Sequence, residues 1–228
     1  MLCEVDILGM TKAQLRRAIL LWRRQKVRII AITGPRKAGK DVLADYILRN
    51  YKGVRHLRIA DAPMLIAKIL GLEADRRIYH ALFGVNKLLY PIIGESAYKR
   101  RVAHVLDAEK PKLAIVEAIR TKEEYREFVE KRKGILVGIV AEPQIRYERA
   151  VFDSRRSKEK RDEGKMTFKE FAGHPKKETG EHSPIEREIQ WILKRAHFII
   201  ENDYKTKEPV YQATREVLSR LSLKKKSR

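Results

Sequence analysis

A glycine-rich loop between an apolar run and an amphipathic stretch constrains this chain more than any other feature. The apolar run covers residues 29–33, and helical periodicity begins at Lys40. The loop itself reads Gly34-Pro35-Arg36-Lys37-Ala38-Gly39-Lys40-Asp41, which matches the G-x-x-x-x-G-K pattern of a P-loop. A chance match in an ordinary loop is the alternative, but the flanking strand and helix are the context that the motif requires.

The residue types in this loop predict phosphate binding. Its glycines let the backbone close around a β-phosphate, and its amides and the N-terminus of the following helix turn positive charge toward that phosphate. Lys40 follows the second glycine, where its side chain can reach the β- and γ-phosphates. All eight residues from Gly34 to Asp41 are therefore candidates for holding ATP.

Apolar runs of strand length alternate with helical patterns along the rest of the chain, which is typical of a parallel sheet covered by helices. The expected strands are residues 27–33, 56–60, 112–116, 135–141 and 197–201. The expected helices are residues 40–49, 63–70, 123–133, 185–195 and 209–221. We therefore expect an α/β fold of three layers, with a five-stranded parallel sheet and a basic helical lid inserted into it.

Segments outside this rhythm define the expected domain organisation. Residues 1–26 carry a capping-box pattern at Thr11 and Gln14, followed by an amphipathic stretch that predicts an added packing helix. We interpret the arginine-rich face of this helix as solvated surface. Residues 27–223 form the predicted P-loop domain, with a basic lid near residues 146–177. The basic tail, residues 224–228, is expected to be disordered.

Asp41 stands where most P-loops offer a Ser or Thr hydroxyl to magnesium. A carboxylate is also a hard oxygen ligand, so Asp41 can hold Mg²⁺ directly or through water. A P-loop ending in Gly-Lys-Asp resembles those of the phage-type deoxynucleoside monophosphate kinases and the animal-type phosphomevalonate kinases, both in the nucleoside monophosphate kinase group. The resemblance implies a P-loop kinase fold and a phosphotransferase that uses ATP and Mg²⁺. A degenerate P-loop that binds nucleotide without turnover is the alternative that Asp41 leaves open.

The resemblance continues at the end of the second predicted strand. Residues 58–63 are similar to the corresponding strand end of the family, where an acidic residue approaches the phosphate acceptor. This similarity implies an acceptor-side role for Asp61. A helix N-cap before Pro63 is the other interpretation of Asp61, and the two do not exclude each other.

After the third predicted strand, residues 115–121 resemble the family's pattern of apolar residues, an acid and a following arginine. An acid at the carboxyl end of a parallel strand points into the ligand crevice, so Glu117 can orient magnesium-bound water and Arg120 can grip an acceptor phosphate. Family members often have Asp where this chain has Glu117. An ordinary surface pair with Glu123 or Glu124 is the alternative for Arg120.

The fourth predicted strand leads into an arginine-rich segment that resembles the lid entry of small-molecule kinases. Arginines there fold over the ATP phosphates and neutralise their charge. We favour Arg149, Arg155 and Arg156 for this role, with a solvated helix charge as the alternative for each. Asn202 follows the fifth predicted strand, and the resemblance implies that its loop lies near the adenine.

The formal net charge of +21 favours anionic partners but does not choose among them. We expect a small phosphorylated acceptor, most simply a nucleoside monophosphate or a related nucleotide, with dephospho-coenzyme A as a further candidate. A nucleic-acid-binding ATPase or polynucleotide kinase is the alternative class. Aromatic residues make up only 7% of the chain and no RNA-recognition signature appears, so we expect weak nucleic-acid binding.

Composition bounds the remaining choices. Cys3 is the single cysteine, which excludes a disulfide framework and favours a reducing, cytoplasmic compartment. The apolar cluster at residues 18–22 is too short to span a bilayer, so no membrane partner is expected. Charged residues at 36%, with few Asn and Gln, favour a thermophilic origin. The histidines lack zinc-ligand spacing, so a protein-bound zinc site is not expected.

Overall fold

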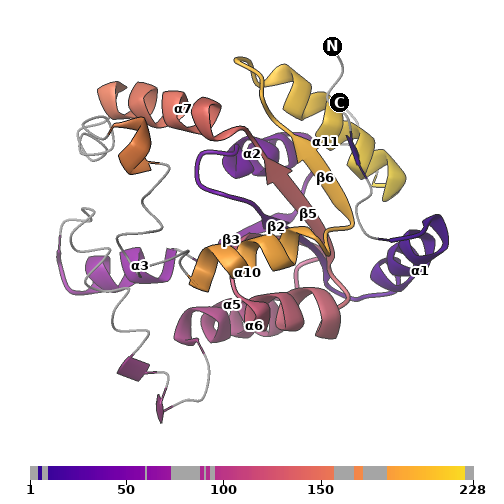
Figure 1. Cartoon of the computed structure of the whole chain (residues 1–228). Helices are drawn as coiled ribbons and strands as arrows, with labels where there is room; N and C mark the ends of the chain where they lie inside the picture. The colour runs from indigo at the N-terminus through magenta and orange to yellow at the C-terminus, as the bar shows by residue number, and fades with distance from the viewer. Residues whose placement is uncertain are drawn as a thin grey trace.

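The computed structural model describes residues 5–6, 10–59, 61–72, 88–89, 91–92, 96–156, 167–171 and 184–223. A six-stranded sheet of order β1-β6-β5-β2-β4-β3 forms the centre of the molecule (Figure 1). The strands are β1 (Val5–Asp6), β2 (Arg28–Thr33), β3 (Val54–Arg58), β4 (Leu113–Ile119), β5 (Ile135–Val140) and β6 (Phe198–Glu201). Strands β2 to β6 are all parallel, which confirms the predicted five-stranded sheet. The short strand β1 adds an antiparallel edge beside β6 that the sequence did not predict.

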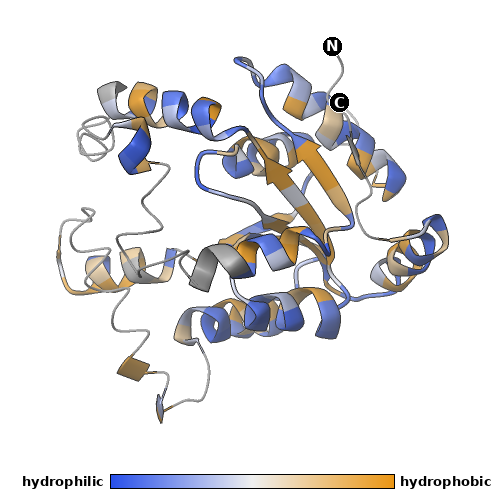
Figure 2. Cartoon of the chain, in the orientation of Figure 1, coloured by the Kyte–Doolittle hydropathy of each residue, from blue (hydrophilic) through white to orange (hydrophobic). Residues whose placement is uncertain are grey.

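Helices cover both faces of this sheet, as the three-layer prediction requires. The helices are α1 (Lys12–Arg23), α2 (Lys40–Asn50), α3 (Asp61–Ile69), α5 (Ala97–Glu109), α6 (Lys122–Tyr125), the π-helix η1 (Arg126–Lys131), α7 (Pro143–Arg156), α10 (Pro184–Leu193) and α11 (Glu208–Arg220). Alternate residues of β2 face opposite sides: Ile30 and Ile32 pack with α1, α2 and α11, whereas Ile29 and Ala31 pack with α5, η1 and α10. The central strands are apolar along nearly their whole length because both faces are buried (Figure 2).

The stretch expected to form an added N-terminal helix is α1 in the structure. Thr11 and Gln14 form its reciprocal capping box, and the Trp22 side chain is fully buried in the core beside β2. The Trp22 indole N–H donates to the carbonyl oxygen of Ile29 at 2.8 Å. This hydrogen bond satisfies the one polar group that a buried tryptophan carries, so α1 is an integral part of this layer.

The clearest differences from expectation are in two strands and one helix. Strand β3 begins and ends two residues earlier than predicted, and β4 extends to Ile119 instead of ending at residue 116. The helix expected at residues 123–133 is a short α-helix followed by the π-helix η1. Hydrophobic periodicity locates a helix but does not distinguish a π-helical stretch from an α-helical one.

Within the described part of the chain, no helix is both long and apolar enough to cross a bilayer. The tail at residues 224–228 and the lid residues 157–166 and 172–177 lie outside the described residues.

Candidate nucleotide site

The predicted P-loop connects the end of β2 to the start of α2 at the carboxyl edge of the sheet. Three of its residues have positive φ: Gly34 (141°), Lys37 (62°) and Gly39 (103°). A Cβ on Gly34 would lie 2.0 Å from the Ile139 carbonyl oxygen, and one on Gly39 would lie 2.4 Å from Nδ2 of Asn202. Both glycines are therefore required by close packing as well as by backbone conformation.

Lys40 is the first residue of α2 and is buried despite its charge, with 9% of its surface exposed. Its Nζ donates to the carbonyl oxygens of Pro35 at 2.7 Å and Gly34 at 3.0 Å, so the side chain folds back across the loop. Burial lowers the pKa of Lys40 to about 8, and the positive charge of Arg120 acts in the same direction, while Glu117 and Asp41 oppose the shift. The predicted site residues Asp41, Glu117 and Arg120 are thus all close enough to Lys40 to affect its charge.

A parallel sheet, a loop with this sequence and conformation, and a helix that starts at the loop lysine occur together in this chain. The chain has a P-loop α/β fold. Among solved structures, a protein called TT1252 from Thermus thermophilus matches with a TM-score of 0.54 at 17% sequence identity, over 85% of this chain and 97% of that one. At this identity the likeness shows a shared fold and says nothing about activity.

Other solved structures are more distant. A shikimate kinase from Bacteroides thetaiotaomicron has a TM-score of 0.45 at 15% identity, covering 86% of this chain and 98% of its own. A dephospho-CoA kinase from Campylobacter jejuni has a TM-score of 0.44 at 15% identity, with the same coverage of both chains. No protein-family model matches the sequence, and no curated protein matches it either.

Glu117 lies on β4 and is held by two residues of the neighbouring strand β3. Its Oε2 lies 2.8 Å from Nε2 of His56 and 3.2 Å from Nε of Arg58, which donates to it. Burial alone would raise the pKa of Glu117, but the hydrogen bond with His56 and the charge of Arg58 outweigh burial and hold that pKa below its usual value. Glu117 is therefore a fixed carboxylate ion beside Lys40.

The backbone beside Glu117 has an unusual conformation. Ala118 has a φ of 71°, and the pairing of β2 with β4 skips this residue: Ile32 pairs with Glu117, and Thr33 with Ile119. The Thr33 hydroxyl donates to the Ile119 carbonyl oxygen at 2.7 Å and closes the bulge. Such left-handed conformations are costly for alanine and are often found at functional sites.

The residues present fit a magnesium ion that is shared with a nucleotide. No group of three or more His, Cys, Asp or Glu side chains that could hold a metal occurs in the described part of the chain. Mg²⁺ needs only one or two carboxylates when substrate phosphates and water complete its shell. Asp41 is exposed on the first turn of α2, next to Lys40, and supplies one such carboxylate. Because Oε2 of Glu117 already accepts from β3, this residue suits contact through magnesium-bound water better than direct ligation.

Arg120 follows β4 and is half-buried, with its main chain fixed by a capping box. Oε2 of Glu124 accepts from the backbone N–H groups of Arg120 at 2.6 Å and Thr121 at 3.0 Å. Burial raises the pKa of Glu124 to about 7, against these two hydrogen bonds and the charge of Arg120. Arg120 and Glu124 are therefore in contact, but Glu124 bonds the backbone N–H of Arg120 and not its guanidinium, which an ordinary surface pair would use.

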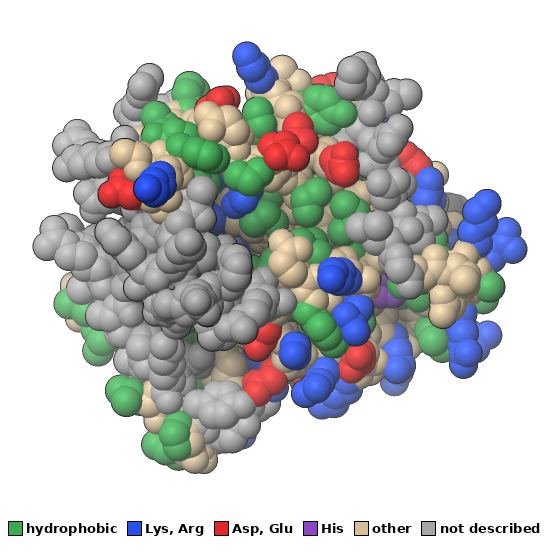
Figure 3. All heavy atoms as spheres, in the orientation of Figure 1, with side chains coloured by type: hydrophobic (Ala, Val, Ile, Leu, Met, Phe, Trp, Pro, Cys, Tyr) green, Lys and Arg blue, Asp and Glu red, His purple; other side chains and the backbone are tan. Residues whose placement is uncertain are grey.

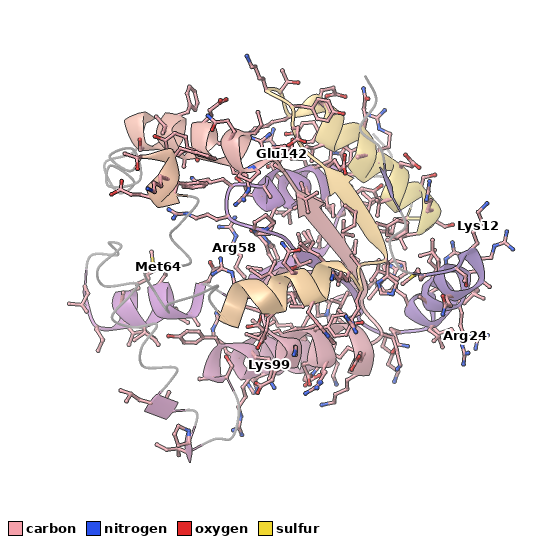
Figure 4. The ribbon with its side chains drawn as sticks, in the orientation of Figure 1. Lys12, Arg24, Arg58, Met64, Lys99 and Glu142 are labelled. Carbon is pink, nitrogen blue, oxygen red and sulfur yellow. The ribbon has the colours of Figure 1, made fainter. Side chains whose placement is uncertain are left out.

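Asp61 is the first residue of α3 and is exposed. The cap interpretation expected the helix to begin at Pro63, but Asp61 itself is helical and contributes an acid to the first turn. Arg58, at the end of β3, lies between the sheet and this helix (Figure 4). Asp61 therefore flanks the edge that carries His56 and Arg58, and its acceptor-side role stays a prediction.

The favoured lid arginines all belong to α7, but only one has a described side chain. Arg155 and Arg156 are the last two residues of this helix, and their side chains lie outside the described residues. Arg149 turns its guanidinium toward carbonyl oxygens of the P-loop and of the segment after β6. Asn202, expected near the adenine, is 3% exposed, and its Nδ2 donates to the Ala38 carbonyl oxygen at 2.7 Å.

His56, Arg58 and Glu124 were not identified as site residues from the sequence. His56 and Arg58 are two residues apart on a strand and so share one face, but only the pairing of β3 with β4 places that face beside Glu117. For Glu124 the sequence did contain a signal: Thr121 and Glu124 have the spacing of a capping box.

Proposed function

We propose that this chain transfers the γ-phosphoryl group of ATP to a small acceptor at the carboxyl edge of the sheet. The observation that supports this most directly is the buried ammonium group of Lys40 in the P-loop, with Asp41, Glu117 and Arg120 close enough to alter its pKa. Phosphoryl transfer depends mainly on positioning and on neutralising charge on the phosphates. These residues supply cations for the phosphates and carboxylates for a metal ion in one place.

Each residue has a distinct role in this proposal. Lys40 exchanges its bonds to Gly34 and Pro35 for phosphate oxygens and stabilises charge on the group in transfer. Asp41, with Glu117 acting through water, would hold Mg²⁺, and the ion when bound neutralises charge on the phosphates. Arg120 grips an anionic group of the acceptor, because its turn is fixed by Glu124 at the carboxyl end of β4.

Other predicted residues complete the site. Asp61 stays the candidate for orienting the acceptor from α3, and Arg155 and Arg156 stay candidates for contacting phosphates from the end of α7. Their helix positions are compatible with these roles. Arg149 is assigned differently below because of its hydrogen bonds.

The acceptor we propose is a nucleoside monophosphate or a related nucleotide. Two observations support an anionic acceptor: Arg58 and Arg120 both lie at the β3–β4 edge, and the chain has a net charge of +21. The Gly-Lys-Asp resemblance favours a nucleotide among such anions. We also propose a reducing, cytoplasmic compartment, because the chain has a single cysteine, and a thermophilic source from its charged composition.

A screen of acceptors tests this proposal. The full chain would be incubated with ATP and Mg²⁺ and, in turn, with nucleoside monophosphates, dephospho-coenzyme A, shikimate, and DNA or RNA with free 5′ ends. ADP formation and the mass of the phosphorylated product would be measured. We expect acceptor-dependent ADP formation with a nucleoside monophosphate. ADP formation only with DNA or RNA would favour the polynucleotide class instead.

The distribution of charge on the surface bears on that alternative class. Among the described side chains on the face viewed in Figure 3, Lys and Arg are interspersed with acidic and apolar residues instead of forming one continuous track. The arginine-rich helix α1, marked by Lys12 at its start and by the capping residue Arg24 after its end, lies away from Arg58 (Figure 4). This arrangement supports a small acceptor over a polyanion that would follow a basic groove.

A further inference from the structure

We propose that Arg149 and Asn202 are positioning residues of the ATP site: together they fix the P-loop against the segment that follows β6. This inference rests on the proposed function, because it assigns how the donor site is held in shape. It also replaces a phosphate contact as the role expected for Arg149.

The hydrogen bonds of Arg149 support this assignment. Its Nη1 donates to the Lys37 carbonyl oxygen at 3.2 Å, on the tip of the P-loop. Its Nη2 lies 2.8 Å from the carbonyl oxygens of Asn202 and Tyr204 and 3.1 Å from Oδ1 of Asn202. One planar guanidinium thus joins the P-loop, the end of β6 and the segment after it, which a single point charge could not do.

Asn202 completes the connection from the other side of the P-loop. Its backbone N–H continues the sheet by donating to the Val140 carbonyl oxygen at 2.8 Å. Its side chain accepts from Arg149 and donates to the Ala38 carbonyl oxygen at 2.7 Å, so both ends of the amide are used. Because Nδ2 occupies the space that a Cβ on Gly39 would need, the amide is packed directly against the loop.

The rest of α7 reinforces the same contact. Arg146, Arg149 and Asp153 lie on one face of the helix, and each reaches the tip of the P-loop. Arg146 donates to the Arg36 carbonyl oxygen at 3.5 Å, and Asp153 pairs with Nζ of Lys37 at 2.6 Å. These bonds engage carbonyl oxygens of the loop, whereas a phosphate is bound by loop amides, so this anchoring does not compete with the ligand for the same groups.

Variants at the two positions separate this role from the alternatives. Arg149→Lys keeps a positive charge but cannot bond the P-loop and the segment after β6 at the same time. Asn202→Ala removes the hydrogen bond to the Ala38 carbonyl oxygen. Arg195→Gln is the matched control, because Arg195 also donates to a carbonyl oxygen, that of Trp191, but in the turn between the end of α10 and the start of β6. All variants would be measured at a temperature at which circular dichroism shows them folded.

Two readouts are taken: ATP affinity by calorimetry, and hydrogen exchange of the amides of residues 36–40 in the absence of nucleotide. We expect Arg149→Lys and Asn202→Ala each to weaken ATP binding by about tenfold or more, the effect of losing hydrogen bonds to a charged or buried group. We expect faster amide exchange in both, a double variant whose loss is less than the product of the single losses, and no change in Arg195→Gln.

The outcomes distinguish this inference from the proposed function. Failure of the wild-type chain to bind ATP would overturn both. If the wild type binds ATP, and Arg149→Lys has the same ATP affinity and the same amide exchange, this inference alone is overturned. A positive charge at position 149 would then be sufficient for ATP binding without the hydrogen bonds of the guanidinium. Equal effects in Arg195→Gln would show a general loss of stability and would overturn it as well.

Discussion

His56 and Glu117 meet across strands β3 and β4, with Nε2 of the imidazole 2.8 Å from Oε2 of the carboxylate. The two side chains are largely buried, with exposed side-chain fractions of 17% and 10%. Through this hydrogen bond, the edge strand β3 holds the Glu117 carboxylate, which lies beside the P-loop residue Lys40. Arg58 adds a second bond to the same oxygen, so Glu117 is held on the side where we place the acceptor.

The first prediction concerns His56. Replacing it with Phe removes the hydrogen bond that lowers the pKa of Glu117, so the acid limb of the pH–rate profile should move to higher pH. We expect activity at neutral pH to fall by about tenfold, as is usual when a supporting hydrogen bond to a site residue is lost. His104→Phe, at an exposed position on α5, is the control. An unchanged acid limb in His56→Phe would show that Glu117 does not need this partner.

The second prediction concerns Asp41 and magnesium. Asp41→Ala should raise the Mg²⁺ concentration needed for half-maximal activity and lower the maximal rate, because the P-loop then offers the ion no side-chain oxygen. Asp41→Ser should recover part of the loss, since a hydroxyl is also a hard oxygen ligand. Titrating activity with Mg²⁺ measures both effects. If the alanine and serine variants both match the wild type, the only role of Asp41 is its favourable charge interaction with the N-terminal end of the α2 dipole.

The third prediction uses two glycines with positive φ. Gly39→Ala should abolish ATP binding, because its Cβ would lie 2.4 Å from Nδ2 of Asn202. Gly53 has a φ of 66° but nothing within 4 Å of a built Cβ, so Gly53→Ala should cost only about 1 kcal/mol of stability and leave ATP binding unchanged. Urea unfolding and calorimetry with ATP check the pair. Comparable ATP binding by both variants would contradict the packing of Gly39 against Asn202.

The fourth prediction concerns the pH dependence of stability. His197 is buried and accepts the N–H of Leu136 at Nδ1, and burial lowers its pKa from 6.5 to about 4. Since the folded state favours the neutral ring, this stability is present above pH 6.5 and is lost as the pH falls through 6.5 toward 4, by up to about 1.4 kcal/mol per pH unit. Urea unfolding from pH 7 to 4.5 would give a shallower dependence in His197→Asn than in the wild type. The same slope in both would assign acid sensitivity to other groups.

The fifth prediction separates a mononucleotide site from a nucleic-acid track by salt dependence. A protein that binds duplex DNA through several phosphates loses affinity with a log–log slope of about −0.9 per contact, and on single strands about −0.7. ATP neutralises only a few charges, so its affinity should change modestly between low and physiological salt. Nucleic-acid binding should be weak and largely lost over that range. Tight RNA binding that survives physiological salt, with RNA-stimulated ATP hydrolysis, would contradict a small-acceptor kinase.

The features that the sequence predicted well are local or periodic. The P-loop is a contiguous motif between a strand and a helix, and the alternation of apolar runs with helices is enough to predict a parallel sheet. The amphipathic character of α1 and its capping box at Thr11 likewise follow from spacing within one helix. These features need no knowledge of which strands are neighbours.

The features that the sequence did not predict depend on pairing or on backbone detail. The contact between His56 and Glu117 requires the register of β3 against β4, which residues 61 positions apart do not reveal. The bulge at Ala118 has no glycine to mark it, although its φ is 71°. Arg149 lies in the arginine-rich segment that the sequence predicts to be a lid. Only the fold shows that its guanidinium faces carbonyl oxygens.

The most direct test of phosphoryl transfer from ATP is acceptor-dependent ADP formation by Lys40→Ala compared with the wild type. Lys40 is the loop cation buried next to Glu117 and Arg120, so its removal should lower the rate on the order of a thousandfold. Circular dichroism and urea unfolding would show that the variant remains folded. A folded, inactive Lys40→Ala chain is the result we predict. Undiminished ADP formation in that variant would contradict the assignment of this site to phosphoryl transfer.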